Sequence, residues 1–494
     1  MCENPQPSTA YLDYARAQVA EKVRASEANA RHTPEREDYP GQHTAWEAVA
    51  DKVTKLSEEL TELADDLHTH PELAFEEFRS RDQIAKLVRR HGHEVTIGFH
   101  GVDTALRAEW QAPGFDPQRH PTIAVMSEYD ALPGIGHACG HNLIAAAGVG
   151  AFLSSISTLD TGRVVLLGTP AEEGHSGKEY MIRGGMLEGV DAAVMMHPFS
   201  YDISEHVWVG RRVIKARFRG IAAHASSQPF MGRNALDAAN LAYHGIGVLR
   251  QQMPPSDRMH AIISDGGQRP SVIPDAAEIT LYLRSSLTEA LKDLSSRIDD
   301  IFHGAALMAG VSVEVDWDVH PATLPIRNNH AMASRWSRTQ ARRGRTALPA
   351  GVVPETLAAS TDFGNVSYLV PGIHPMVKIA PGSVALHTEA FETCARGEQA
   401  RSAVVDSAIG LGQVIVDLIR DPELLAQAQQ EFAAAGGALS VQNTFSYCRA
   451  STIGVWSSMA RRTMPRCSTP RRTMISTSVP SFSCSPFAAV LICS

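Results

Sequence analysis

The sequence has little of what marks secreted, membrane-spanning or nucleic-acid-binding proteins. Seven cysteines among 494 residues are too few for a disulfide framework, which favours a reducing compartment, and we predict a cytoplasmic protein. The formal net charge of −9 leaves no basic surface for nucleic acid. No apolar run approaches the ~18 residues of a membrane span, and the first residues lack the basic and apolar regions of a secretory signal. We therefore expect no nucleic-acid partner and no membrane.

What the chain does have is the composition of a globular protein with a large core. Apolar residues make up 44% of it and charged residues 20%. A chain of this length is expected to form two or three domains. Apolar residues at helical spacing dominate the beginning of the chain, and we predict a helical extension over residues 1–50.

Strand and helix patterns alternate over residues 51–206 and resume over residues 322–437. Strands are expected at TALRAEW, TIAVMSEYD, RVVLLG, DAAVMMHP and IHPMVKIA, and helices at LIAAAGVGAFLSSI and at GEQARSAVVDSAIGLGQVIVDLIRD. Apolar strands that alternate with helices are typical of βαβ units. The sequence therefore predicts an α/β domain with a mostly parallel sheet.

Residues 207–321 interrupt that domain with a different pattern. Strand-like and helical stretches follow one another there in the order β-α-β-β-α-β, which is typical of a split βαβ sandwich, a ferredoxin-like fold. We expect this segment to form a small inserted domain.

The end of the chain, residues 438–494, is unlike the rest. No Asp or Glu follows Glu431, and the last 49 residues hold six Arg, no Lys and four of the seven cysteines. No helical or strand period is visible there. We expect a disordered tail or a reading-frame artefact, with a tail that binds nucleic acid or membrane as the remaining alternative.

Polar motifs stand directly after four predicted strands: EYDALPG, AEEGH, HP and ALHTEAF. In an open α/β sheet, ligands bind outside the carboxyl ends of the strands. These motifs are therefore expected to converge, together with the segment GHACGHN that leads into a helix. The candidate site residues in them are Cys139, His141, Glu172, Glu173, His197 and His387.

These residue types are metal ligands. Cys139 and His141 stand two positions apart, so both point the same way in an extended turn. Glu172 and Glu173 are adjacent and cannot both face one atom, so one can bind metal while the other takes a proton from water that the metal activates. Five ligands are more than one tetrahedral zinc ion binds, which favours a site with two ions. Taken singly, each residue has a commoner explanation: a small core cysteine, a solvated Glu pair, a capping histidine.

The motifs DLHTHPELAFEE, SEYDALPGIGHACGHNL, GTPAEEGHSGK, MMHP, GIAAHASSQPFMGRNALDA, STDFGNVSYLVPGIHP and LHTEAF, in this order, resemble metallopeptidase family M20. That family holds aminoacylases, carboxypeptidases and N-acyl-amino-acid amidohydrolases. The resemblance covers roughly residues 50–435. It is strongest to the branch with a cysteine in the metal site, and within it to the β-alanyl-lysine dipeptidase and p-aminobenzoyl-glutamate hydrolase groups.

The resemblance implies a role for each matched residue. Two divalent ions, zinc before manganese or cobalt, would be bound by Cys139, His141, Glu173, His197 and His387. Glu172 would be the general base. The inserted domain would be a lid that pairs two subunits in a homodimer, with His224 reaching the neighbouring site to stabilise the oxyanion. Arg284 would hold the substrate carboxylate. His137 and His175 have no ligand role in the pattern.

The chain departs from the family at two positions. Ser271 stands where the family usually has Asn before Val-Ile-Pro, which concerns substrate placement, and Asn142 replaces the commoner Asp. The sequence as a whole predicts a metal-dependent amidohydrolase acting on a dipeptide or N-acyl-amino acid. The alternatives are a non-catalytic metal- or ligand-binding member of the same fold, and a thiol enzyme with Cys139 as nucleophile.

Overall fold

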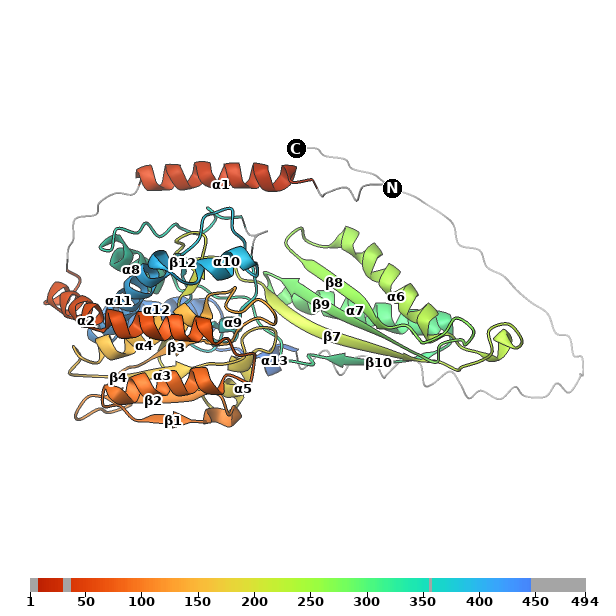
Figure 1. Cartoon of the computed structure of the whole chain (residues 1–494), viewed down its shortest axis with the longest axis horizontal. Coiled ribbons are helices and arrows are strands. Elements are labelled where there is room, and N and C mark those ends of the chain that lie inside the picture. Colours follow the sequence, from red (N-terminus) through yellow and green to blue (C-terminus); the bar gives the residue numbers. More distant parts are fainter. Residues whose placement is uncertain (1–7, 30–36, 355–357, 446–494) are drawn as a thin grey trace, which may run out of the picture. The chain divides into compact units, whose positions relative to one another are not determined.

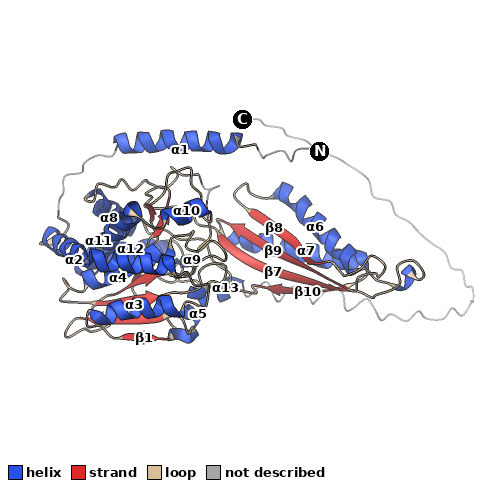
Figure 2. Ribbon diagram, in the orientation of Figure 1, coloured by secondary structure: helices blue, strands red, loops and turns tan. Residues whose placement is uncertain are grey.

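A computed structural model describes residues 8–29, 37–354 and 358–445 of the chain. Its main sheet has six strands in the order β1-β2-β4-β3-β5-β11 (Figures 1 and 2). In that order the strands are Val95–Ile97, Leu106–Gln111, Arg163–Gly168, Thr122–Ser127, Ala192–Val194 and Gly372–Ile373. Strands β3, β4, β5 and β11 run parallel, whereas β1, β2 and β4 pair antiparallel. The sheet is therefore mixed: its parallel part, β4-β3-β5-β11, extends to one edge, and the antiparallel strands β2 and β1 lie at the other edge.

Sequence periodicity explains the central strands. All six residues of β3 are buried, as are five of six in β4, which fits their continuous apolar runs. Helices α2 (Gln42–Thr69), α4 (His141–Ser155) and α11 (Glu398–Arg420) pack on one another in the same core. Small residues on α4 permit close packing, since a Cβ at Gly150 would lie 2.7 Å from Ala408 on α11 and from Leu60 on α2.

The expected domain boundary at residue 50 is wrong, because α2 is one helix that crosses it. Ala45 and Val49 are buried in the same core as the sheet. Ahead of α2 the structure has α1 (Ala10–Asn29). Val19 and Val23 of α1 pack with Met376 of a two-stranded parallel sheet, formed by β6 (His197–Phe199) and β12 (Met376–Lys378).

The remaining helices of this part cover the sheet and its connections. They are α3 (Phe78–Arg90), α5 (Gly177–Arg183), α8 (His330–Ala341), α9 (Phe363–Ser367), α10 (Glu389–Cys394) and α12 (Pro422–Ala434), with a short 3-10 turn η1 (Phe99–Gly101).

Helix α11 contains an 18-residue window with a mean hydropathy of 1.6, long and apolar enough to cross a membrane by composition. The expectation that no such stretch exists overlooked it. Because 89% of that window is buried against other elements of the protein, α11 is a core helix.

The inserted segment has the expected βαββαβ order and a core of its own. Its elements are β7 (Gly210–Arg219), η2 (Pro229–Met231), α6 (Ala235–Leu249), η3 (Arg250–Gln252), β8 (Arg258–Asp265), β9 (Ala276–Ser285), α7 (Thr288–Ala309) and β10 (Ser312–Trp317). The strands form an antiparallel sheet in the order β10-β7-β9-β8, so β8 is an edge strand (Figure 2). Strand β9 alternates strictly between buried and half-buried residues, as expected for a sheet covered on one face.

The prediction of a tail without structure from residue 438 is wrong for its first residues. Residues Val441–Phe445 form helix α13, and Val441 and Phe445 are buried in the core of the inserted domain. The guanidinium of Arg212 lies 4.2 Å from the centre of the Phe445 ring and pairs with Asp318. Two apolar side chains at one helical spacing were too short a pattern to detect. The rest of the predicted tail, residues 446–494, lies outside the described residues.

We predict that Phe445→Ala lowers the thermal unfolding temperature. Phe445 is 6% exposed, and truncating a buried Phe typically costs about 3–5 kcal/mol of unfolding free energy. Differential scanning calorimetry would measure the change, with the exposed neighbour Gln442 changed to Ala as the control. Equal unfolding temperatures for the two variants would show that Phe445 of α13 contributes nothing to the stability of the inserted domain.

Candidate metal centre and active site

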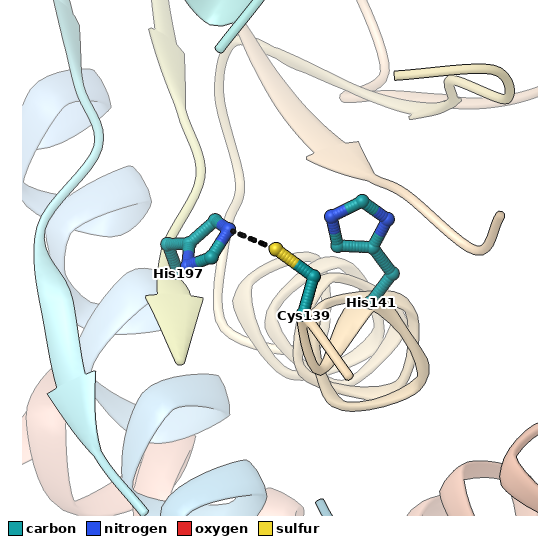
Figure 3. Close-up of side chains that lie close together, drawn as sticks. All are labelled: Cys139, His141 and His197. Atoms are coloured by element: carbon teal, nitrogen blue, oxygen red, sulfur yellow. Dashed lines mark hydrogen bonds between the residues drawn. The ribbon is translucent and has the colours of Figure 1, made fainter. Parts of the chain in front are cut away.

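The cysteine and the first histidine lie where strand β3 leads into helix α4. His141 is the first residue of α4, and Cys139 is buried two positions before it. Gly140 between them has φ 79°, which favours glycine, and a Cβ there would lie 2.8 Å from Pro198 Cγ. Pro198 follows His197, so this glycine lets the segment approach β6. Figure 3 shows Cys139 pointing towards His197, with the Cys139 Sγ–His197 Nε2 distance at 3.5 Å.

The structure brings all six candidate residues together. Their ligand atoms form three groups, each with all atoms within 4.8 Å: Cys139–His141–His197, Cys139–Glu173–His387 and His141–Glu172–Glu173. His387 Nε2 lies 3.4 Å from Glu173 Oε1, and His141 Nε2 lies 3.9 Å from Glu172 Oε2. His137 and His175 belong to none of these groups within the described residues.

Hydrogen bonds behind the cluster orient the rings. His141 Nδ1 lies 3.1 Å from Asp130 Oδ1 and 3.0 Å from the Asp130 carbonyl oxygen. His197 Nδ1 donates to the Pro198 carbonyl at 2.7 Å. The second Asp130 oxygen accepts the Glu173 backbone N–H at 2.8 Å. Both imidazoles therefore turn Nε2 towards the centre, which is how carboxylate and carbonyl partners usually orient histidine ligands of a metal.

Two atoms of the cluster are buried and have no hydrogen-bond partner among the described residues: His141 Nε2 and Glu173 Oε1. Leaving buried polar atoms unpaired costs free energy. A soft thiol, imidazole nitrogens and a carboxylate oxygen that all face one another are a donor set suited to divalent transition-metal ions. The residues present thus fit the metal pair that the sequence implies.

The loop that carries Glu172 and Glu173 joins β4 to α5. Ala171 and Ser176 have φ values of 61° and 60°, a region that non-glycine residues rarely adopt. The Ala171 N–H donates to Glu77 Oε1 at 2.8 Å, and the Ser176 hydroxyl donates to the Pro321 carbonyl at 2.7 Å. Contacts with distant parts of the chain therefore hold the loop in a strained path, as is common at functional sites.

Electrostatics of the side chains alone are unfavourable. Burial and the neighbouring carboxylate of Glu173 raise the pKa of Glu172 well above its usual value. Burial and Glu173 likewise raise the pKa of the Cys139 thiol. Burial, together with His141, lowers the pKa of His197 to about 3. Negative groups are thus packed against one another without matching positive charge. Bound divalent cations would lower the pKa of the Glu172 carboxyl and of the Cys139 thiol, and would favour the neutral form of His197 that its low pKa already favours.

A buried ion-pair cluster beside the site was missed by sequence reasoning. The Lys178 ammonium contacts Glu128 and lies 2.7 Å from Asp362 Oδ1, and all three side chains are fully buried. Glu128 Oε2 in turn lies 3.6 Å from His141 Nε2. All three residues stand in the motifs SEYDALPG, GTPAEEGHSGK and STDFGNVS. The three residues were therefore visible in the sequence, but the sequence alone did not show that Lys178 in one motif contacts the carboxylates of the two others.

An aromatic wall around His197 was also missed. The rings of Trp208 and His374 lie 5.1 and 5.5 Å from the His197 ring, and Phe363 stacks on His374 at 5.0 Å. Apolar surroundings of this kind limit water access and lower the local dielectric around a metal ligand. Trp208 comes from the chain entering the inserted domain and gave no motif signal.

His224 and Arg284 lie in the inserted domain, and neither contributes to the three ligand groups of the described residues. His224 is exposed, forms a β-bridge with Val272, and its Nδ1 accepts the backbone N–H groups of Ser226 and Ser227 at 3.3 Å. The proton of a neutral ring therefore sits on Nε2. Ser271 is exposed, and its carbonyl accepts the Ala225 N–H on the same surface.

Comparison with known proteins agrees with this geometry. Residues 124–403 match the model of peptidase family M20/M25/M40. The chain is 36% identical over 415 residues to the Xaa-Arg dipeptidase of Mus musculus, covering 81% of this chain and 96% of that protein. It is 28% identical over 456 residues to one subunit of the p-aminobenzoyl-glutamate hydrolase of Escherichia coli, covering 78% and 94%.

Solved structures share the fold. A dinuclear metal binding peptidase of the M20 family from Bacillus subtilis aligns with a TM-score of 0.56 at 22% identity, over 74% of this chain and 99% of that one. An aminobenzoyl-glutamate utilization protein from Klebsiella pneumoniae aligns with a TM-score of 0.58 at 19% identity, over 75% and 98%. The family match, the relatives and the converging site together show that the chain belongs to peptidase family M20/M25/M40 and is a hydrolase of amide bonds.

Proposed function

We propose that the protein is a dinuclear metal-dependent dipeptidase or N-acyl-amino-acid hydrolase. The observation that carries this proposal is the pair of ligand groups that share Cys139, with the carboxylate of Glu172 beside them. Cys139, His141, Glu173, His197 and His387 would hold the ions. A thiolate favours zinc, whereas manganese or cobalt suits the imidazole and carboxylate ligands.

The bound ions would supply a water of lowered pKa and polarise the scissile carbonyl. Glu172 would accept the proton of that water and pass it to the leaving amine. It is suited to this because its carboxylate faces the cluster, with Oε2 lying 3.9 Å from His141 Nε2. The buried Lys178, paired with Glu128 and Asp362, offsets part of the negative charge behind Glu172.

We further propose that two copies of the chain pair through the inserted domain. Edge strand β8 exposes Ile262 and Ile263, which are 63% and 38% accessible, and helix α6 exposes Val248 at 62%. An exposed apolar edge strand is a template for pairing with another chain. Pairing of two such edges would also allow His224, whose neutral ring carries its proton on Nε2, to stabilise the oxyanion in the neighbouring subunit's site.

The Xaa-Arg dipeptidase relative suggests a dipeptide as substrate, with Arg284 binding its carboxylate. A hydrolysis screen of metal-free protein reloaded with Zn²⁺, Mn²⁺ or Co²⁺ tests the proposal. The panel would hold Xaa-Arg and β-alanyl dipeptides, p-aminobenzoyl-glutamate and N-acetyl amino acids. Tight binding of these compounds without turnover under every metal would favour the non-catalytic alternative.

We also propose a cytoplasmic location, which would keep the Cys139 thiol reduced; fractionation of the native host would test it.

We predict that Glu172→Gln retains metal and loses at least ~100-fold in kcat, because the amide keeps the shape of the side chain but cannot accept a proton. Glu173→Gln should instead lose metal. Measuring metal content by mass spectrometry together with kcat distinguishes the two variants. Equal metal content in both variants would contradict this division of roles.

Cys139→Ser is expected to lower metal affinity, because serine is a poor ligand at neutral pH whereas a metal-bound thiol ionises. Competition with a chelator would measure the affinity. Cys394→Ser, at a partly buried cysteine outside the cluster, is the control and should bind metal as the wild type does. A chelator should also abolish the wild-type activity. Activity that survives complete metal removal would favour the thiol enzyme instead.

His224→Ala should lower kcat without changing metal content, and His303→Ala, also exposed in the same domain, should not. Mixing His224→Ala and Glu172→Gln subunits should restore activity, because one site of each heterodimer then carries neither defect. If verified subunit exchange gives no activity above the two parents, His224 does not act across the dimer.

A further inference from the structure

We infer that Arg211 is a second substrate-binding arginine, which together with Arg284 binds the terminal carboxylate of the dipeptide. This inference rests on the proposed function. The two residues lie directly opposite each other on the antiparallel strands β7 and β9. Their guanidinium groups share one aromatic support, since the Tyr282 ring centre lies 5.7 Å from Arg211 and 5.2 Å from Arg284.

Like charges placed directly opposite on neighbouring strands destabilise a sheet. Two other arginines of this sheet pair with carboxylates: Arg212 with Asp318 at 2.7 Å, and Arg217 with Glu278 at 2.9 Å. Arg258, which lies opposite Arg284 on its other side, on β8, donates instead to the backbone carbonyl of Asp257 at 2.8 Å. Arg211 and Arg284 have no carboxylate within 4.0 Å among the residues that the structure describes. An anion bound by both guanidinium groups would neutralise their charges.

Arg211 is only 7% exposed, and its Nε has no hydrogen-bond partner in the described part of the chain. A buried guanidinium nitrogen without an acceptor is costly. The half-buried Arg284 adds to that cost, because burial and the charge of Arg211 lower its pKa. The nearby histidine rings supply no negative charge: His175 and His320 meet edge to face with ring centres 4.4 Å apart, and His260 lies near Arg284.

The pair lies beside the loop of the candidate base. Arg211 Nη2 donates to the Ser176 hydroxyl at 3.1 Å, and a Cβ at Gly174 would lie 3.9 Å from Arg211 Nη1. Gly174 directly follows Glu173. A carboxylate held by Arg211 would therefore lie next to the loop that supplies Glu172 to the reaction, within one subunit.

The chemistry of the pair selects a carboxylate. Two guanidinium groups present planar, parallel N–H donors that match its two oxygens. The terminal carboxylate of a dipeptide lies a fixed few bonds from the scissile amide, so anchoring it positions that amide. A peptide whose terminus is blocked leaves both guanidinium groups without an anion and is rejected.

The test compares a dipeptide with its C-terminal carboxamide on the metal-loaded enzyme. Arg211→Gln should lower kcat/KM for the dipeptide that the screen shows to be hydrolysed fastest by about 10- to 100-fold, mainly through KM, because a charged hydrogen bond is lost. The carboxamide, which the wild type is expected to hydrolyse poorly, should change little. Arg211→Lys should recover part of the loss. Arg219→Gln, an exposed arginine on the same strand, is the matched control.

An equal loss on dipeptide and carboxamide would assign Arg211 to support of the loop and overturn the inference, as would no loss on either. Calorimetry with β-alanyl-L-lysine and its carboxamide gives a readout independent of turnover. Tighter binding of the free acid by the wild type, lost in Arg211→Gln, supports the pair even if hydrolysis fails. Hydrolysis without any preference for the free acid would overturn the pair and leave the proposed function standing.

Discussion

An excess of buried negative charge at the carboxyl edge of the sheet is the constraint on which the site depends. Glu128, Asp130, Glu172 and Asp362 lie buried or nearly so near one another, and Lys178 offsets part of their charge. Buried charges of one sign are tolerated when cations are present. The histidine and cysteine ligands, turned inward by bonds to Asp130 and to the Pro198 carbonyl, indicate where those cations belong.

The backbone that presents these groups is held from several directions. The loop with the two glutamates bends through unfavourable conformations at Ala171 and Ser176. Ser176 is bonded to Arg211, where the chain enters the inserted domain, and to Pro321, where it leaves. A movement of the inserted domain would therefore shift the loop that carries Glu172, because the Ser176 hydroxyl is bonded to both ends of that domain. The inserted domain and the loop are thus connected through the side chain of Ser176.

Element type was predictable because periodicity is local. The buried runs of β3 and β4, the long helix α11 and the βαββαβ insertion all followed from apolar spacing. The ends of the elements and the relative direction of the strands could not be predicted in this way. Helix α2 crosses the expected boundary at residue 50, β1 and β2 pair antiparallel, and α13 packs on the inserted domain. Each depends on burial against a distant element, which spacing along the chain does not record.

The sequence by itself determined the candidate ligands, since cysteine, histidine and glutamate in motifs after strands indicate a metal site through their chemistry, and the family resemblance names Glu173 and not Glu172 as the ligand. Tertiary structure alone decided which charges offset one another. Lys178 reaches two carboxylates that lie 50 and 184 residues away along the chain, and Arg211 faces Arg284 without an acid between them. Electrostatic interactions act through space and depend on burial, so residue order could reveal the ligands but not the charges around them.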